Sequence, residues 1–134
     1  MEKEILKKRL LSWVLYLVYF IFFLNLGAML FSWYWTIRWF DVPMHFLGGF
    51  WSILFLSWLY LFTPLGRFGK KIVFLVSGLI LISLFWEFFE FILNRVSHLG
   101  ANTLIDSAKD LFFDSLGGVT AYFYLKQKGI WQNK

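Results

Sequence analysis

The sequence predicts an all-α, polytopic membrane protein, a compact bundle of four transmembrane helices in one domain covering residues 1–134. Of its 134 residues, 60% are hydrophobic and 24% aromatic, and the mean hydropathy is +0.66. A soluble domain this short cannot bury so much apolar surface. The apolar residues also form runs close to the roughly 20 residues that a helix needs to cross a bilayer. We therefore expect a multi-pass protein of the cytoplasmic membrane.

Four segments are predicted to span the membrane, at residues 10–34, 44–62, 72–93 and 106–125. No small-residue cleavage pattern follows the first, so we interpret it as a retained anchor. The second ends at a Thr-Pro-Leu-Gly turn signal, and the third carries two glutamates in its outward half. The fourth is the weakest, because its first half carries three aspartates and a lysine.

The basic residues predict the orientation of these spans. With a cytoplasmic N-terminus, ten of the thirteen basic residues lie on the cytoplasmic side, leaving Arg38, Arg95 and Lys109 toward the outside. A three-span arrangement would place the C-terminal lysines outside and spoil this asymmetry. Four spans with both termini cytoplasmic fit better. Topology then explains the net charge of +5, and no nucleic-acid partner is expected.

The acidic residues gather in the outward half of this arrangement. Glu87 and Glu90 lie roughly 22–27 Å from the cytoplasmic start of the third span, at about 1.5 Å per residue. His45 opens the second span. The six acids concerned are Asp41, Glu87, Glu90, Asp106, Asp110 and Asp114. Three helices thus deliver acids to a similar depth.

Helical spacing predicts that these polar residues face one another. Asp106, Asp110 and Asp114 are four residues apart and form one stripe. Small residues, which let helices approach closely, continue that stripe and follow His45 on its own face. They are Gly117, Gly118 and Ala121 in the fourth span, and Gly48, Gly49 and Ser52 in the second. Ser83 continues the glutamate face, and Asn25 and Ser32 would join from the first span.

The energetics of burial favour a bound cation. A carboxylate at bilayer depth costs roughly 2.5–3.5 kcal/mol on insertion scales, and three outward basic residues cannot offset six acids. One divalent metal ion would offset several of these negative charges at once. Histidine with carboxylates suits zinc, manganese or iron, whereas carboxylates alone suit magnesium or calcium. With Zn, Mn or Mg in view, we assign His45, Glu87 and Asp110 as metal ligands. Glu90 and Asp106 are candidate catalytic groups, and Asp41 and Asp114 complete the polar pocket.

Simpler structural roles remain open for each of these residues. The glutamate pair would serve as a contact for Arg95 or Lys109, and Asp106 as an exposed helix cap. His45 would be a neutral histidine near the headgroups. His98, in the outer loop, is not assigned to the site.

Three runs resemble the VanZ-like membrane proteins and the related YjdF-like group, over about residues 41–121. They are Asp41-Val-Pro-Met-His45-Phe46, Trp86-Glu87-Phe-Phe-Glu90 and Asp110-Leu-Phe-Phe-Asp114-Ser-Leu-Gly117. The VanZ-like pattern often has Gln at the position of Glu90 and Asn at that of Asp114. The spacing of Asp106 and Asp110 looks like the YjdF-like form. The resemblance implies a cell-envelope setting and names no reaction.

Three functions are compatible with this sequence. The first is a metal-dependent enzyme acting on a membrane lipid or lipid-linked envelope precursor at the outer leaflet. The second is a cation or proton transport protein, although the cytoplasmic halves of the spans hold no acid and a pore would need a homo-oligomer. The third is a non-catalytic binding or assembly protein that receives a cationic ligand in its acidic pocket.

Overall fold

The computed structural model describes residues 2–67, 69–97 and 104–131, with the side chains of 93–97 excepted. His98 and the side chain of Arg95 lie outside the described part. The described chain is helical and contains no strand, which confirms the all-α prediction. Its elements are α1 (Glu2–Leu30), α2 (Trp33–Thr36), α3 (Asp41–Phe62), the 3₁₀ turn η1 (Pro64–Arg67), α4 (Lys71–Ser97) and α5 (Leu104–Gln127).

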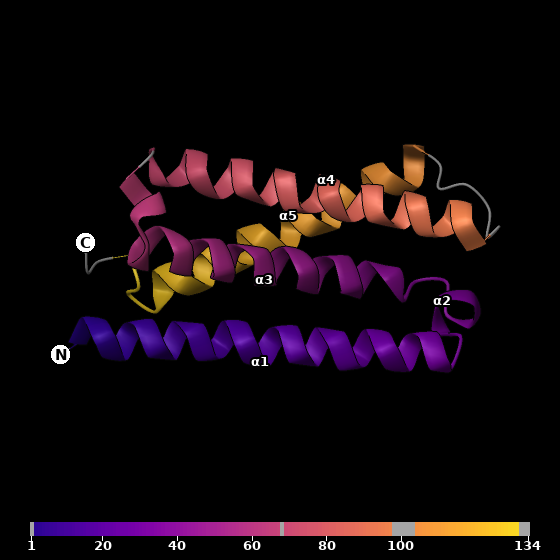
Figure 1. Cartoon of the computed structure of the whole chain (residues 1–134), viewed down its shortest axis with the longest axis horizontal. Helices are drawn as coiled ribbons and strands as arrows, with labels where there is room; N and C mark the ends of the chain where they lie inside the picture. The colour runs from indigo at the N-terminus through magenta and orange to yellow at the C-terminus, as the bar shows by residue number, and fades with distance from the viewer. Residues whose placement is uncertain (1, 68, 98–103, 132–134) are drawn as a thin grey trace.

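The four long helices alternate in direction along the bundle (Figure 1). Helix α3 is central: it packs against α1 and α4 and most extensively against α5, which crosses it obliquely. Helices α1 and α4 lie on either side of α3, and their described residues make little contact with one another. The start of α1 and the end of α5 lie at the same end of the molecule.

Three of these helices are long and apolar enough to cross a membrane: Glu2–Leu30, Asp41–Phe62 and Lys71–Ile92. Large apolar side chains such as Tyr16, Phe23 and Phe85 are exposed along them, as expected of surfaces that face lipid. Helix α5 is not among the three, so the fourth span stays a prediction.

The helix boundaries differ from the predicted spans. Helix α1 ends at Leu30 rather than at residue 34, because Ser32 adopts a left-handed conformation (φ 56°) that breaks the helix before α2. Asp41, which precedes the predicted second span at 44–62, is the first residue of α3. Its carboxylate there benefits from the positive end of the helix dipole. Hydropathy marks the apolar length of a helix and misses the polar residues in its terminal turns.

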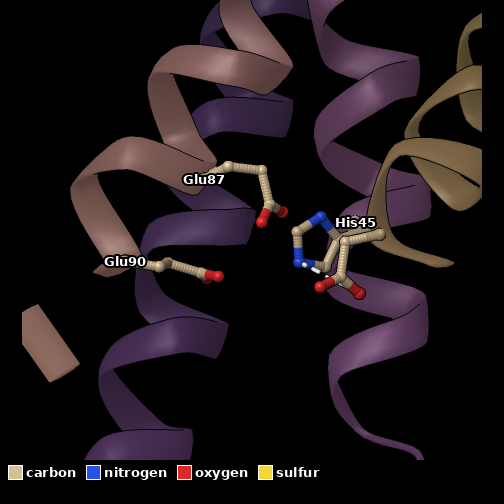
Figure 2. Close-up of side chains that lie close together, drawn as sticks. His45, Glu87 and Glu90 are labelled. Carbon is tan, nitrogen blue, oxygen red and sulfur yellow. Dashed lines mark ion pairs between the residues drawn. The ribbon is translucent and has the colours of Figure 1, made fainter. Parts of the chain in front are cut away.

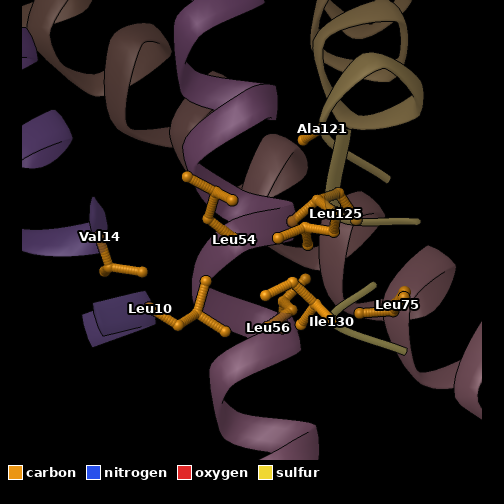
Figure 3. Packing of buried hydrophobic residues seen from close by; sticks show 9 residues of the cluster. Leu10, Val14, Leu54, Leu56, Leu75, Ala121, Leu125 and Ile130 are labelled. Carbon is orange, nitrogen blue, oxygen red and sulfur yellow. The ribbon is translucent and has the colours of Figure 1, made fainter. Parts of the chain in front are cut away.

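The apolar core occupies the end of the bundle where α1 begins (Figure 3). All four long helices contribute to it, and the chain after α5 adds one residue. The residues drawn and labelled there are Leu10, Val14, Leu54, Leu56, Leu75, Ala121, Leu125 and Ile130. This tightly packed half fixes the helices, and the acidic residues of α3, α4 and α5 lie together in the other half.

Glycines set the close approach of α3 and α5. A Cβ atom added at Gly49 would overlap the backbone carbonyl of Asp114, and one at Gly117 would overlap the carbonyl of Phe46. Gly118 and Ala121 are also buried. The small faces of the two helices therefore meet, as the spacing predicted, and their contact carries Asp110 and Asp114 toward His45.

Candidate functional site

Three helices bring one histidine and three acids together in the acidic half of the bundle. His45 of α3, Glu87 and Glu90 of α4 and Asp110 of α5 each offer a ligand atom, and these four atoms lie within 4.8 Å of one another. Figure 2 shows both glutamates reaching from α4 toward the ring of His45. We call these four residues the His45 cluster.

Carboxylates surround the buried ring of His45, which is 3% exposed. Nδ1 lies 3.3 Å from Oδ1 of Asp114. Nε2 lies 3.7 Å from Oδ1 of Asp110 and 3.6 Å from Oδ1 of Asp41, and it has no hydrogen-bond partner. Because a carboxylate accepts, the contact with Asp114 favours a proton on Nδ1 and leaves the Nε2 lone pair facing carboxylate oxygens. Such an arrangement needs a cation between them, either a proton or a metal ion.

Glu87 carries a second unsatisfied group. Both of its carboxylate oxygens are buried, and neither has a hydrogen-bond partner. Buried carboxylates in proteins are normally paired or bound to a metal, because an isolated one costs several kcal/mol. Lys109 does not supply the missing charge, since its Nζ lies 3.4 Å from Oδ1 of Asp106 in an exposed pair. In the described chain, the only ion pairs of this cluster are those of His45.

Glu90 connects the cluster to a cavity. The indole Nε1 of Trp86 donates a 2.8 Å hydrogen bond to Oε1 of Glu90, which holds the carboxylate in place. Glu90 and His45 both line a cavity of about 270 Å³ between α1, α3 and α4. Its volume lies just below the roughly 300–1,000 Å³ typical of small-molecule sites. Glu87 and Asp110 do not line it.

The same cavity reaches a tyrosine that the sequence did not single out. The hydroxyl of Tyr34 in α2 donates a 2.6 Å hydrogen bond to Oδ1 of Asn25 in α1, and both residues line the cavity. Burial raises the pKa of the Tyr34 phenol to about 12, and the charges of Asp41 and Glu90 act in the same direction. Tyr34 therefore stays protonated and serves as a hydrogen-bond donor.

The predicted site residues lie within the cluster, next to it or outside it. Of the three predicted metal ligands, His45, Glu87 and Asp110 all lie in the cluster, together with Glu90. Asp114 and Asp41 adjoin it through the ring of His45, although the side chain of Asp41 is 43% exposed. Asp106 is exposed and lies outside the cluster and the cavity lining. Ser32 is exposed as well, whereas Ser83 is buried beside the cavity.

The fold and the site define a helical membrane protein with a buried histidine–carboxylate cluster. The chain belongs to the family described as predicted membrane protein (DUF2238), whose family model matches residues 5–128. Comparisons with curated proteins and with solved structures gave no match.

Proposed function

We propose that the His45 cluster binds one divalent metal ion, and that the protein is a metal-dependent hydrolase or transferase acting on a lipid or lipid-linked envelope precursor. One observation carries the metal proposal. Nε2 of His45 and both oxygens of Glu87 are buried without hydrogen-bond partners, in a group whose ligand atoms lie within 4.8 Å. A single ion would satisfy all of these atoms.

The ligand set favours His45, Glu87 and Asp110 as the residues that hold the metal. Metal–ligand bonds of about 2.0–2.2 Å place two ligands of one ion roughly 3–4 Å apart. The 3.7 Å between Nε2 of His45 and Asp110 falls in that range and exceeds a hydrogen bond. Asp114 on Nδ1 would orient the ring, as carboxylates commonly do for metal-bound histidines. One nitrogen with carboxylate oxygens suits zinc or manganese better than magnesium.

Glu90 has the position of a general base. It faces the cluster on one side and the cavity on the other, and the hydrogen bond from Trp86 fixes its carboxylate. A bound divalent ion would polarise a substrate oxygen or lower the pKa of a water molecule. Glu90 would then accept a proton from the nucleophile at the cavity wall.

For the setting, we propose four spans with both termini cytoplasmic and the cluster toward the extracytoplasmic face. Basic residues at the end of the bundle away from the cluster support this arrangement. Lys71 begins α4, and its Nζ lies 4.5 Å from the ring centroid of Trp131, which follows α5. Arg9 lies over Trp13, so basic and aromatic residues meet at the end of the bundle away from the cluster. The resemblance of the three acidic runs to VanZ-like and YjdF-like proteins supports a cell-envelope role.

A binding protein for a cationic ligand is the second candidate. Asp41, Glu90 and Asp114 all border the cavity and would attract an amine directly. Transport by a single chain is less well supported. The acids of α3, α4 and α5 lie in one half of the bundle, whereas a packed apolar core fills the other half and the only described acids there are Glu2 and Glu4 in the first turn of α1.

Metal content measured on the purified protein tests the proposal. We expect about one zinc or manganese ion per chain by elemental analysis, and loss of that ion in Glu87→Gln with helicity by circular dichroism unchanged. Asp106→Asn is the matched control, because Asp106 is an exposed acid outside the cluster. A wild-type chain that remains metal-free after reloading, or an Asp106→Asn variant that loses metal equally, would overturn the metal site.

The enzymatic part needs a separate measurement. The metal-loaded protein, incubated with a total envelope-lipid extract, should convert at least one lipid phosphate as seen by mass spectrometry. Glu90→Gln should abolish conversion and retain the metal. Conversion that persists in Glu90→Gln would exclude Glu90 as the base, and an extract left unchanged by the loaded wild type would favour the binding protein.

A further inference from the structure

The cavity beside the cluster extends along the bundle axis. Its lining runs from Val18 to Asn25 on α1 and from Asp41 to Ser52 on α3. At about 1.5 Å per helical residue, these stretches of seven and eleven steps measure roughly 10 and 16 Å. Half of a hydrocarbon core of about 30 Å is about 15 Å. The cavity is therefore about as deep as one leaflet of the bilayer.

Polar and apolar groups are separated along this length. Asn25, Tyr34, Asp41 and Glu90 line the end toward α2, and His45 lies next along the wall. Asp114 of α5 lies beside His45 in the lining. Most of the other lining residues are apolar and come from three helices: Val18, Ile21, Phe22, Met44, Trp51 and Ile82. The two serines of the lining lie among them, and the hydroxyl of Ser52 is satisfied by the carbonyl of Gly48 at 2.8 Å. The cavity thus matches a molecule with a polar head and an apolar tail.

The cavity is open on one side, between α1 and α4. Both helices pack on α3, and their described residues hardly touch each other. Phe22 on α1 and Trp86 on α4 line the cavity and are 58% and 43% exposed, so they form its rim. Both belong to membrane-spanning helices, so this opening faces lipid chains rather than water.

We infer that this cavity takes one hydrocarbon chain of a lipid phosphate, which enters sideways from the bilayer between α1 and α4 and places its head beside His45 and Glu90. The phosphate head rests on the proposed function, because the carboxylates of the cluster repel an anion until a divalent cation is bound. The tail does not, since its contacts are with the mainly apolar part of the lining, which holds no metal ligand. The two parts can therefore be tested separately.

Photo-crosslinking in vesicles tests the tail. The probe is phosphatidylglycerol with a diazirine in its acyl chain, incorporated in phosphatidylcholine vesicles with the full chain. We expect labelled peptides at Val18, Ile21 and Ile82, in excess over the exposed Phe23 and Phe85. Val18→Trp should fill the cavity and reduce that labelling several-fold. Leu15→Trp, on the exposed face of the same helix, should leave it unchanged.

Ile82→Trp blocks the cavity from α4 and provides a second variant if Val18→Trp fails to fold. Even labelling of all exposed apolar residues would show annular lipid only and overturn the inference. Labelling unaffected by a folded blocking variant would overturn it as well. So would protein–protein crosslinks at Val18 and Ile82 in place of lipid, because a second copy would then cover the opening.

Competition in the metal-loaded protein tests the head and distinguishes its source. Unlabelled polyprenyl phosphate that reduces the labelling more than unlabelled phosphatidylglycerol would assign a single-chain lipid, and the reverse a diacyl lipid. In either case, the uncharged alcohol or diacylglycerol should compete at least several-fold less well. Equal competition by the uncharged lipids would overturn the phosphate head. Chelation should abolish the phosphate preference and leave the tail labelling, so the metal site and the cavity fail independently.

Discussion

In the proposed metal site, Asp114 would act through the ring of His45 rather than through contact with an ion. Its carboxylate lies 3.3 Å from Nδ1 and is itself buried, at 5% exposure. Asp114→Asn keeps the side-chain shape and removes the charge that orients and polarises the ring. We expect metal affinity to fall about 10–100-fold, the usual effect of losing such a partner, with helicity retained. Calorimetric titration of zinc into the metal-free protein measures the change.

Asp106→Asn is the control for this titration, because it removes one carboxylate from the same helix at an exposed position. Its affinity should stay within about twofold of wild type. If Asp114→Asn binds zinc as tightly as wild type, the ring is held by its packing alone.

Glu87 is expected to reduce the stability of the metal-free protein. Its carboxylate oxygens are buried without hydrogen-bond partners, which lowers the free energy of unfolding. Replacing the group with an apolar side chain in Glu87→Leu should therefore raise the melting temperature of the metal-free form. Metal should stabilise the wild type, by about 2.7 kcal/mol at a concentration 100-fold above Kd, and should not stabilise the variant. Thermal unfolding in detergent, with and without zinc, measures both effects. A Glu87→Leu variant that is less stable without metal would assign Glu87 a structural role.

At the scale of elements, the contact between α3 and α5 places two of the acids. Gly49→Ala and Gly117→Ala should each separate these helices, because the new methyl group would overlap the opposing backbone. Backbone cannot yield as a flexible side chain does, so we expect a loss of about 1–3 kcal/mol in unfolding free energy. Metal affinity should fall with it. Denaturant unfolding in mixed micelles gives the first quantity.

Gly27→Ala is the matched control, because a Cβ atom at Gly27 would have nothing within 4 Å and the residue also lies within a helix. Alanine there should be neutral or stabilising by up to about 1 kcal/mol. Equal destabilisation by all three changes would mean that the loss does not come from the α3–α5 contact.

Helical periodicity predicts much of the site from the sequence, and the prediction fails where periodicity alone does not decide burial. Spacing placed Asp110 and Asp114 on one face with Gly117, and the structure buries all three. Asp106 shares that spacing and is exposed, because α5 crosses α3 obliquely and its first turn extends past the contact (Figure 1). A single sequence gives the face of a helix and does not give its crossing angle.

The turn at Ser32 was equally beyond the sequence. Apolar residues continue through it, so the first span was predicted to reach residue 34. The left-handed conformation of Ser32 instead starts α2, and α2 carries Tyr34 to the cavity. The hydrogen bond from Trp86 to Glu90 was also beyond the sequence, because it depends on rotamers that no pattern shows. Tyr34 and Trp86 each carry one polar group on an aromatic ring, and a count of hydrophobic residues includes both.

At the scale of the molecule, the question is whether α5 crosses the membrane. Composition argues against it, since the helix carries Asp106, Lys109, Asp110 and Asp114. Burial argues for it, because Asp110 and Asp114 are 6% and 5% exposed and lie against His45 rather than lipid. The charges that lower its hydropathy are thus largely hidden within the bundle. With α5 antiparallel to α4, the bundle closes around the cluster only if α5 shares the depth of the other helices (Figure 1).

Labelling of single-cysteine variants tests whether α5 crosses the membrane. The chain has no cysteine of its own, so each variant carries one reactive thiol. We predict that Thr36→Cys, at the end near the cluster, reacts with a membrane-impermeant maleimide on intact spheroplasts. Lys3→Cys and Gln127→Cys, both exposed at the opposite end, should react only after lysis. Labelling of Gln127→Cys on intact spheroplasts, with Lys3→Cys protected, would leave three spans and an exterior C-terminus. Because α5 supplies Asp110 and Asp114, that result would also mean that the acids meet His45 from outside the membrane, where water would compete for every ligand.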